Sequence, residues 1–425
     1  MITKTICIAN RVNINYIHTS KFKTNRMVFN FISPLTKENA HFNAMLPLIM
    51  MRATESYPSI SAINKRLQYL YSGDISATNT SFGGCQIFGM KVNMLNNKYT
   101  QGTDVTMETL DLVCEMIFKP YTVNGVFDKE YTESEKTNLI DTIKSEINNK
   151  GRYAIKRTLA EMCKEEAFGT SIYGNMEEVE KITSQSLYNA YKQALSTYPI
   201  EIYVVGDCDV ESIANKLKSY FDKIERNPLT IELAKTVSSA SETKYVTDKE
   251  SVNQGKLVLG YRTGYRYEEN KYHILQLFNE IFGGSPTSKL FVNVREKMSL
   301  CYSCHSIINQ ANGIMLISAG IDEKNNKITE NAIIEQLEMI KQGKVSEEEL
   351  ESAKKSIING YMSVYDSPSS MASWMFYRTL CGTKTTPANE VEKIKNTTLE
   401  QVMMLANRMT LDTVYLLKGK GGKDE

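Results

Sequence analysis

An internal repeat limits the fold of this chain more than any other feature of its sequence. The segment Val179-Glu180-Lys181-Ile182 recurs as Val391-Glu392-Lys393-Ile394. At the same spacing, Tyr203 in Ile-Glu-Ile-Tyr-Val-Val-Gly corresponds to Tyr415 in Thr-Val-Tyr-Leu-Leu-Lys-Gly. Self-similarity of this kind indicates that one supersecondary unit is used twice. We therefore expect two copies of one α/β unit with a single cleft between them.

Hydrophobic periodicity in each copy predicts both strands and helices. In the first copy, residues 27–33 alternate like a half-buried strand, and residues 40–51 form an almost wholly apolar segment typical of a buried helix. In the second copy, residues 255–261 and 272–282 repeat this strand and this helix. The mixed order predicts an α+β fold of two homologous half-domains, each with a mostly antiparallel sheet packed by helices.

The length of the chain and one irregular segment indicate the domain boundaries. A chain of 425 residues is too long for a single hydrophobic core. Residues 227–249 contain Pro228 and a serine-rich run without sustained periodicity, as linkers do. We therefore predict an N-terminal domain over residues 1–226, a linker over residues 227–249 and a C-terminal domain over residues 250–425.

Charge and hydropathy argue against several classes of partner. The 50 basic and 49 acidic side chains leave a net charge of +1, so no overall field attracts nucleic acid or an anionic membrane. The longest apolar run, residues 44–51, is far too short to span a bilayer. The N-terminal segment lacks the features of a signal peptide, and the eight cysteines are scattered through a long chain. We therefore expect a cytoplasmic protein with reduced thiols.

Residues 281–303 contain the most specific motif. Gly283 and Gly284 can adopt positive φ at little cost, which predicts a tight turn. Ser285 then stands at an N-cap position, and Pro286 at the first helical position, where its missing N–H is not needed. The motif therefore predicts a turn followed directly by a capped helix.

The predicted helix leads to two polar side chains seven residues apart. Leu290, Val294 and Met298 repeat every four residues and predict one buried stripe. Arg295 leaves the helix near its C-terminal end, and Tyr302 follows as the chain becomes extended. By themselves these two residues could be an Arg in solvent and a Tyr in the core.

The whole motif resembles the C-terminal half-domain of the pitrilysin/insulinase family of zinc peptidases. That half-domain has a Gly-Gly turn, a helix that ends in Arg-Glu-Lys, and then Leu-x-Tyr. The resemblance covers nearly the whole chain and implies a clam shell of two insulinase-like half-domains. It also implies that Arg295 and Tyr302, beside the Gly283-Gly284 turn, reach a peptide substrate at the zinc site of an opposite half-domain.

The same resemblance implies that the zinc site has been lost. A zinc-binding member has His-x-x-Glu-His on the first long helix, with a downstream Glu as the third ligand. Here the segment 40–51 places Ala44, Pro47 and Leu48 at the three motif positions, and Glu133 matches the downstream ligand. We therefore expect a degenerate zinc site, with no metal or other cofactor bound by this chain and the zinc carried by a partner.

The four histidines supply no alternative motif. A register that begins at His41 places Met45 where the second histidine belongs. His18, His273 and His305 also lack a histidine four residues away. We therefore expect each of the four to be a single surface or core histidine.

Residues 301–305, Cys-Tyr-Ser-Cys-His, match the pattern of covalent haem attachment. We set haem aside because the sequence shows no export signal. A redox or metal role for Cys301 and Cys304 is also disfavoured, because alternation along a strand places side chains at odd spacing on opposite faces.

Three functions are compatible with these features. Retention of Arg295 and Tyr302 without the zinc helix favours a non-catalytic subunit of a heterodimeric zinc metalloendopeptidase, active only with a zinc-bearing partner. The alternative is a peptide- or protein-binding scaffold without a proteolytic role. A third function is a hydrolase with an unorthodox metal site, such as Glu133 with Cys or His residues that folding brings close.

Overall fold

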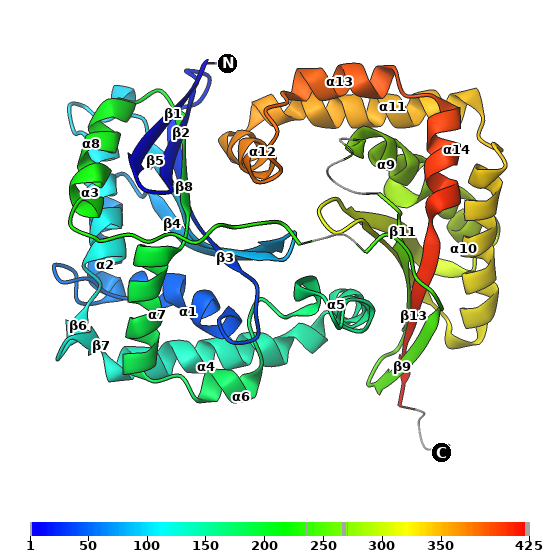
Figure 1. The fold of residues 1–425 in the computed structure, drawn as a ribbon, viewed down its shortest axis with the longest axis horizontal. Coiled ribbons are helices and arrows are strands. Elements are labelled where there is room, and N and C mark those ends of the chain that lie inside the picture. Colours follow the sequence, from blue (N-terminus) through cyan, green and yellow to red (C-terminus); the bar gives the residue numbers. More distant parts are fainter. Residues whose placement is uncertain (1, 235–236, 266–268, 270, 421–425) are drawn as a thin grey trace. The chain divides into compact units, whose positions relative to one another are not determined.

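The computed structural model describes residues 2–234, 237–265, 269 and 271–420 (Figure 1). The chain forms two compact units, each built from more than one segment. Unit 1 comprises Met1–Lys144, Thr170–Leu233 and Tyr365–Leu380, and unit 2 comprises Ser145–Gly169, Ala234–Val364 and Cys381–Glu425. Both halves of the sequence therefore contribute to both units.

A six-stranded sheet forms the centre of unit 1, with the strand order β1-β2-β8-β3-β5-β4. Its neighbouring strands are antiparallel except β2 and β8, which run parallel. The predicted strand at residues 27–33 is confirmed as the middle of β3. The strands of the sheet are β1 (Ile2–Ala9), β2 (Val12–His18), β3 (Thr24–Pro34), β4 (Asp74–Phe82), β5 (Cys85–Leu95) and β8 (Ile200–Gly206), and the short β6 (Thr122–Val123) and β7 (Val126–Phe127) pair separately.

Several helices of unit 1, including α2, α3, α7 and α8, begin where a side chain caps the first turn. Ser59 Oγ accepts a hydrogen bond from the Ala62 N–H at the start of α2, as an N-cap does. The apolar segment predicted at residues 40–51 forms α1, which continues through Pro47. The helices are α1 (Ala40–Met50), α2 (Ile60–Tyr69), α3 (Val105–Phe118), α4 (Lys129–Ser145), α6 (Met176–Glu180), α7 (Ser184–Thr197), α8 (Val210–Phe221) and α12 (Pro368–Leu380), with the 3₁₀ turn η1 (Asn97–Tyr99).

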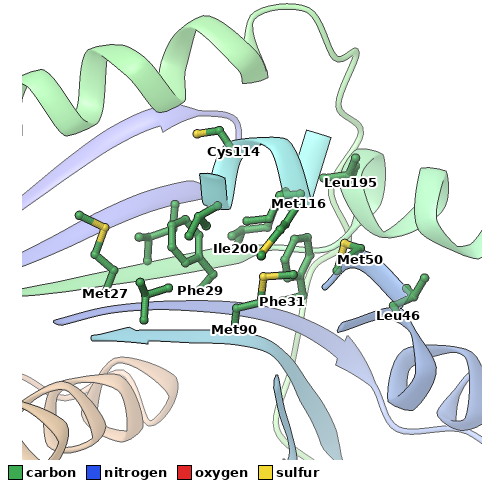
Figure 2. Packing of buried hydrophobic residues seen from close by; sticks show 14 of the residues in the cluster. Met27, Phe29, Phe31, Leu46, Met50, Met90, Cys114, Met116, Leu195 and Ile200 are labelled. Carbon is green, nitrogen blue, oxygen red and sulfur yellow. The ribbon is translucent and has the colours of Figure 1, made fainter. Parts of the chain in front are cut away.

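The main core of unit 1 lies between one face of this sheet and its helices (Figure 2). Met27, Phe29 and Phe31 alternate along β3 and point to the same face. Leu46 and Met50 of α1 pack against the same cluster, with residues of α3, α7 and α8. The intervening residues of the strands point to the opposite face, which needs a cover of its own.

Unit 2 is built on a five-stranded sheet with the order β11-β12-β10-β13-β9. Its neighbouring strands are antiparallel except β13 and β9, which run parallel. The predicted strand at residues 255–261 is confirmed as β10. The strands are β9 (Lys244–Glu250), β10 (Gly255–Arg262), β11 (Cys301–Asn309), β12 (Ile314–Ile321) and β13 (Thr410–Gly419).

The helices of unit 2 come from both halves of the sequence. The helix predicted at residues 272–282 ends as an α-helix at Asn279 and continues as a π-helix. The α-helices are α5 (Lys150–Met162), α9 (Tyr272–Asn279), α10 (Asn326–Lys341), α11 (Glu347–Met362), α13 (Pro387–Lys395) and α14 (Leu399–Arg408), the π-helices are η5 (Glu280–Gly284) and η6 (Leu290–Lys297), and the 3₁₀ turns are η2 (Glu146–Asn148), η3 (Ala167–Gly169), η7 (Glu323–Asn325) and η8 (Ser363–Asp366).

The two sheets share one topology, as the internal repeat predicts. The order β2-β8-β3-β5-β4 in unit 1 matches β9-β13-β10-β12-β11 in unit 2, and the parallel pair lies at the same end. The repeated tyrosines Tyr203 and Tyr415 lie on the matching strands β8 and β13. The α+β fold with mostly antiparallel sheets packed by helices is therefore confirmed.

The segment expected to be a linker contains a strand. The chain passes from unit 1 to unit 2 between Leu233 and Ala234, inside residues 227–249, but β9 begins at Lys244. Periodicity missed β9 because it is an edge strand with mostly exposed polar side chains. Within the predicted linker, residues 235–236 lie outside the described part of the chain, as do residues 421–425 of the predicted C-terminal domain.

Each sheet is covered on one face by a helix from the other half of the sequence. In unit 1, Met371, Ala372 and Phe376 of α12, drawn in orange beside the blue strands, pack on the face opposite the main core (Figure 1). The Tyr203 ring lies edge-on to the Phe376 ring, with 5.7 Å between the ring centroids. The Tyr203 hydroxyl donates a hydrogen bond to Thr379 Oγ1 at 3.0 Å. No sequence pattern indicates this exchange of covering helices.

In unit 2 the corresponding cover is α5. Ala154 and Met162 pack with the buried Tyr415. The hydroxyl of Tyr415 donates a hydrogen bond to Asp248 on β9 at 2.8 Å, and the same carboxylate accepts one from Nε of Arg157 on α5 at 2.9 Å. The two repeated tyrosines therefore have equivalent roles. Each packs against the covering helix that comes from the other half of the sequence.

A buried ion network also attaches the α5 segment to the sheet of unit 2. Arg262 on β10 is 2% exposed. Its guanidinium donates to Asp412 Oδ2 on β13 at 2.8 Å, to Glu166 Oε1 at 2.6 Å and to the Met162 carbonyl oxygen at 2.9 Å. One cation therefore neutralises a buried carboxylate of the sheet and another that follows α5.

The exchange of the covering helices α5 and α12 between the two halves of the sequence predicts that neither half of the chain contains a complete unit. A fragment of residues 1–233 lacks α12 and leaves an apolar face of its sheet in water. We expect this fragment to bind a hydrophobic dye and to self-associate, and a synthetic peptide of residues 365–380 to reduce both effects. A monomeric fragment with cooperative unfolding and no dye binding would contradict the exchange.

Arg262→Met should destabilise unit 2 strongly. The substitution fills similar volume but leaves two carboxylates without their cation, and breaking a buried ion pair in this way costs about 3–5 kcal/mol. Urea denaturation followed by circular dichroism measures the change. Lys395→Met is the control, because Lys395 pairs with Glu392 on the surface of α13, and such pairs contribute little. Equal stability of the two variants would contradict the role of the network.

Candidate functional site

The motif at residues 281–303 lies in unit 2, and its glycines adopt a conformation that differs from the predicted turn. Gly283 and Gly284 end the π-helix η5, and neither has positive φ. The expected left-handed turn is therefore wrong. Gly283 is needed for another reason, which is the lack of a side chain.

Gly283 allows η5 to approach both the next helix and strand β11. A Cβ at this position would lie 2.7 Å from Cδ1 of Leu290, 2.7 Å from Oγ of Ser306 and 2.9 Å from the Ser306 backbone nitrogen. A Cβ at Gly284 would lie 2.7 Å from Nδ2 of Asn279. Real Cβ atoms do not come this close to backbone atoms, so position 283 requires glycine, whereas at position 284 the nearest atom belongs to a side chain that can move.

The second helix of the motif starts later than the sequence predicts. Ser285 caps no helix; its hydroxyl donates to the Glu280 carbonyl oxygen at 3.2 Å, and the π-helix η6 begins at Leu290. Leu290 and Val294 are buried as predicted, but Met298 is 44% exposed. A π-helix has more residues per turn than an α-helix, so the third position of the expected stripe turns away from the core.

Arg295 lies in the last turn of η6, where the sequence placed it. Its Cζ lies 4.4 Å from the centroid of the Phe291 ring, a cation–π distance that holds the guanidinium in place. Its nearest carboxylate oxygen, on Glu296, is 3.9 Å away, beyond hydrogen-bond distance. Within the described residues, no side chain or carbonyl accepts a hydrogen bond from this guanidinium, so its donors are open to a ligand.

A strained residue links η6 to β11. Ser299 has a φ of 51°, in the left-handed region that non-glycine residues rarely adopt. The Leu300 N–H donates to the Val294 carbonyl oxygen at 3.2 Å, which closes the end of the helix. This link turns the chain within two residues, so Arg295 and the start of β11 lie close together.

Tyr302 is the extra residue of a β-bulge at the start of β11. Cys301 pairs with Ile321 and Ser303 pairs with Gly320, so Tyr302 has no partner on β12. The side chain of Tyr302 is 70% exposed, which excludes a core tyrosine. Bulges redirect side chains in this way and occur often beside functional sites.

Arg295 and Tyr302 line the same hollow, of about 670 Å³. The irregular link supplies Ser299 to its wall, and an adjacent hollow of about 610 Å³ shares Tyr302 and Asp322. The structure thus brings together the two residues that the sequence singled out. It also adds Asp322 and Lys324, which form an ion pair at 3.2 Å at the end of β12. Only the pairing of β11 with β12 reveals these two, so residue spacing missed them.

The positions of the expected zinc motif carry no metal-binding atoms. Ala44 and Pro47 are buried and Leu48 is partly buried in α1, and their side chains have no nitrogen, oxygen or sulfur. Glu133 on α4 is exposed, and its Oε1 accepts a hydrogen bond from Lys136 at 2.9 Å. The residues at these positions therefore do not fit a zinc ion.

The other acidic and imidazole groups near this helix are engaged in packing. Glu135 is buried and accepts a hydrogen bond from Arg52 at 3.1 Å. His41 is buried with its ring 4.3 Å from that of Phe42, and burial lowers its pKa. Among the residues that the structure describes, no three His, Cys, Asp or Glu side chains gather as a metal site would require.

Comparisons with known proteins agree with the family that the motif resembles. A family profile described as "Peptidase M16 inactive domain" matches residues 181–357. "Probable inactive metalloprotease YmfF" of Bacillus subtilis (strain 168) is 32% identical over 407 residues, which cover 96% of this chain and 95% of the relative. This similarity extends over both units.

Solved structures show the same fold over the full length. The crystal structure of a conserved protein from Enterococcus faecalis V583 has a TM-score of 0.93 at 28% identity, covering 99% of this chain and 100% of that chain. A peptidase M16 inactive domain from Pseudomonas fluorescens has a TM-score of 0.78 at 14% identity and covers all of both chains.

Gly283→Ala should destabilise unit 2, because the added methyl group meets the backbone nitrogen of Ser306. Overpacking of this kind costs about 1–3 kcal/mol, which a thermal unfolding experiment detects as a lower Tm. Gly360→Ala is the matched control, because it adds the same methyl group to α11 where nothing lies within 4 Å. The control should raise stability by about 0.5–1 kcal/mol. A Gly283→Ala variant as stable as the parent would show that the glycine is not needed for close packing.

Proposed function

The chain belongs to the peptidase M16 family, that of the pitrilysin/insulinase peptidases, and we propose that it is a non-catalytic subunit of a heterodimeric zinc metalloendopeptidase. One observation carries this proposal. Arg295 and Tyr302 open onto one hollow with free donor groups, whereas Ala44, Pro47 and Leu48 cannot bind zinc. The chain has thus kept a surface for substrate and lost the site for the metal.

The chemistry of Arg295 and Tyr302 suits a peptide backbone. A guanidinium presents several N–H donors in a fixed plane, and a phenol presents one O–H. Fixed donors of this kind stabilise the negative charge that develops on a carbonyl oxygen during acyl transfer. Phe291 fixes the plane of the guanidinium, and the bulge fixes the direction of Tyr302. The guanidinium is therefore held by packing, and the phenol projects from the bulge at the same hollow.

The partner in this proposal is a second M16 chain that carries the zinc motif. This chain supplies part of the chamber, and the substrate is a peptide. The proposal includes a cytoplasmic location, which the eight free cysteines support. In the described part of the chain, no helix has the length and apolar character that a membrane span requires.

Arg295→Ala should lower the peptidase activity of the complex and leave its assembly intact. Loss of one preorganised donor typically costs about 10²–10³ in rate. The measurement is cleavage of a peptide by the purified complex of the two chains, with size-exclusion chromatography to check assembly. Tyr302→Phe, which removes only the hydroxyl group, should lower activity in the same direction.

Lys297→Ala is the matched control. Lys297 is a cation at the same end of η6, but it bonds to Asn293 and does not line the hollow. Wild-type activity for Arg295→Ala would refute the proposed role. Peptide binding by this chain alone, unaffected by addition of a zinc-bearing chain, would instead indicate a binding scaffold.

A further inference from the structure

The β-bulge at Tyr302 places Cys301 and Cys304 on one face of β11. In a regular strand, residues three apart point to opposite faces. Here the bulge inserts one residue, and the exposed fractions of Cys301 and Cys304 are 7% and 3%, whereas Tyr302 and Ser303 between them are exposed. The expectation that strand geometry separates the two thiols is therefore wrong.

The two thiols have pKa values shifted in opposite directions. A hydrogen bond from the Cys304 thiol lowers the pKa of Cys301; burial opposes this effect, and the nearby charge of Arg295 adds to it. The same hydrogen bond, together with burial, raises the pKa of Cys304. One thiol is thus favoured as the thiolate nucleophile and the other as its proton-bearing neighbour.

Other buried thiols of the chain lack this arrangement. Burial raises the pKa of Cys85 to about 11 and that of Cys114 to about 12. Burial also raises the pKa of Cys163 to about 12. Cys301 additionally lines the hollow of Arg295 and Tyr302, so a small molecule in that hollow can reach its sulfur. Reactivity and access therefore coincide at Cys301.

The backbone spacing at the bulge suits a disulfide after a small contraction. Cys301 pairs with Ile321 and Cys304 with Ala319, and these two partners are alternate residues of β12, roughly 6.6–6.8 Å apart between Cα atoms. Disulfides span Cα distances of about 4.4–6.8 Å. Closing the bond therefore pulls the two ends of the bulge together, and Tyr302 lies between them.

We propose that Cys301 and Cys304 form a redox-modification site that low-molecular-weight disulfides convert reversibly into an intramolecular disulfide, which displaces Tyr302 in the hollow. The shared face of the two thiols and the access to Cys301 from the hollow carry this proposal. The disulfide can form whether or not the chain is a peptidase subunit.

The thiol–disulfide exchange with the small disulfide proceeds in two steps. The Cys301 thiolate attacks one sulfur of the small disulfide, forms a mixed disulfide and releases one thiolate. Cys304 loses its proton to solvent and attacks Sγ of Cys301, which forms the Cys301–Cys304 bond and releases the second thiolate. The protein loses two electrons, and the small disulfide is reduced to two thiols. Excess small thiol reverses both steps.

The test uses the full chain and glutathione disulfide as the probe. Intact mass should fall by two hydrogens, two free thiols should be lost, and peptide mapping should place the bond between Cys301 and Cys304. Dithiothreitol should restore both thiols. In Cys304→Ser the second step is blocked, so one glutathione adduct should remain on Cys301. The samples for these measurements carry Cys7→Ser, which removes an exposed thiol elsewhere on the chain, and only the parent chain used to check the oxidising conditions keeps Cys7.

A second readout follows the displacement of Tyr302. Hydrogen exchange at the backbone amides of residues 300–304 should change on oxidation, whereas exchange in α8 of unit 1 should not. Absence of the 301–304 bond under conditions that oxidise Cys7 in the parent chain would overturn the site. Bond formation without any change in exchange at residues 300–304 would overturn the displacement. Neither result depends on peptidase activity, so failure here is distinct from failure of the proposed function.

Discussion

The fold depends on the cover that each half of the sequence provides for the sheet of the other unit. Without α12 the Tyr203 face of unit 1 is open, and without α5 the Tyr415 face of unit 2 is open. Both sheets have apolar residues on this face, and a sheet with two apolar faces must be packed on both. The two copies of the repeat are thus alike in topology but do not fold as separate halves of the chain.

The candidate site is built from irregular backbone on this regular frame. Two π-helices, a left-handed Ser299 and a β-bulge follow one another between Glu280 and Ser303. Each of these irregular features costs some stability, and backbone strain of this kind is found mainly where a functional site needs side chains in particular orientations. Here the result is that Arg295, Tyr302 and Cys301 all reach one hollow. Phe291 and the β11–β12 pairing hold them there.

Sequence reasoning predicted the fold better than the details of the site. The repeat predicted two copies of one unit, and the matching tyrosines do lie on matching strands. It could not reveal the exchange of α5 and α12, since that depends on packing between segments far apart in the chain. Gly283 was identified from its motif, but its role is close approach rather than positive φ. The bulge at Tyr302 has no local signature, so the shared face of Cys301 and Cys304 was missed.

The central proposal is that this chain works with a zinc-bearing relative. The most direct measurement is affinity purification of the chain from its native cell, with mass spectrometry and metal analysis of the purified complex. We predict a stoichiometric partner of similar size that carries His-x-x-Glu-His, together with one zinc per pair of chains. Recovery of this chain alone, or with an unrelated protein and no zinc, would contradict the account.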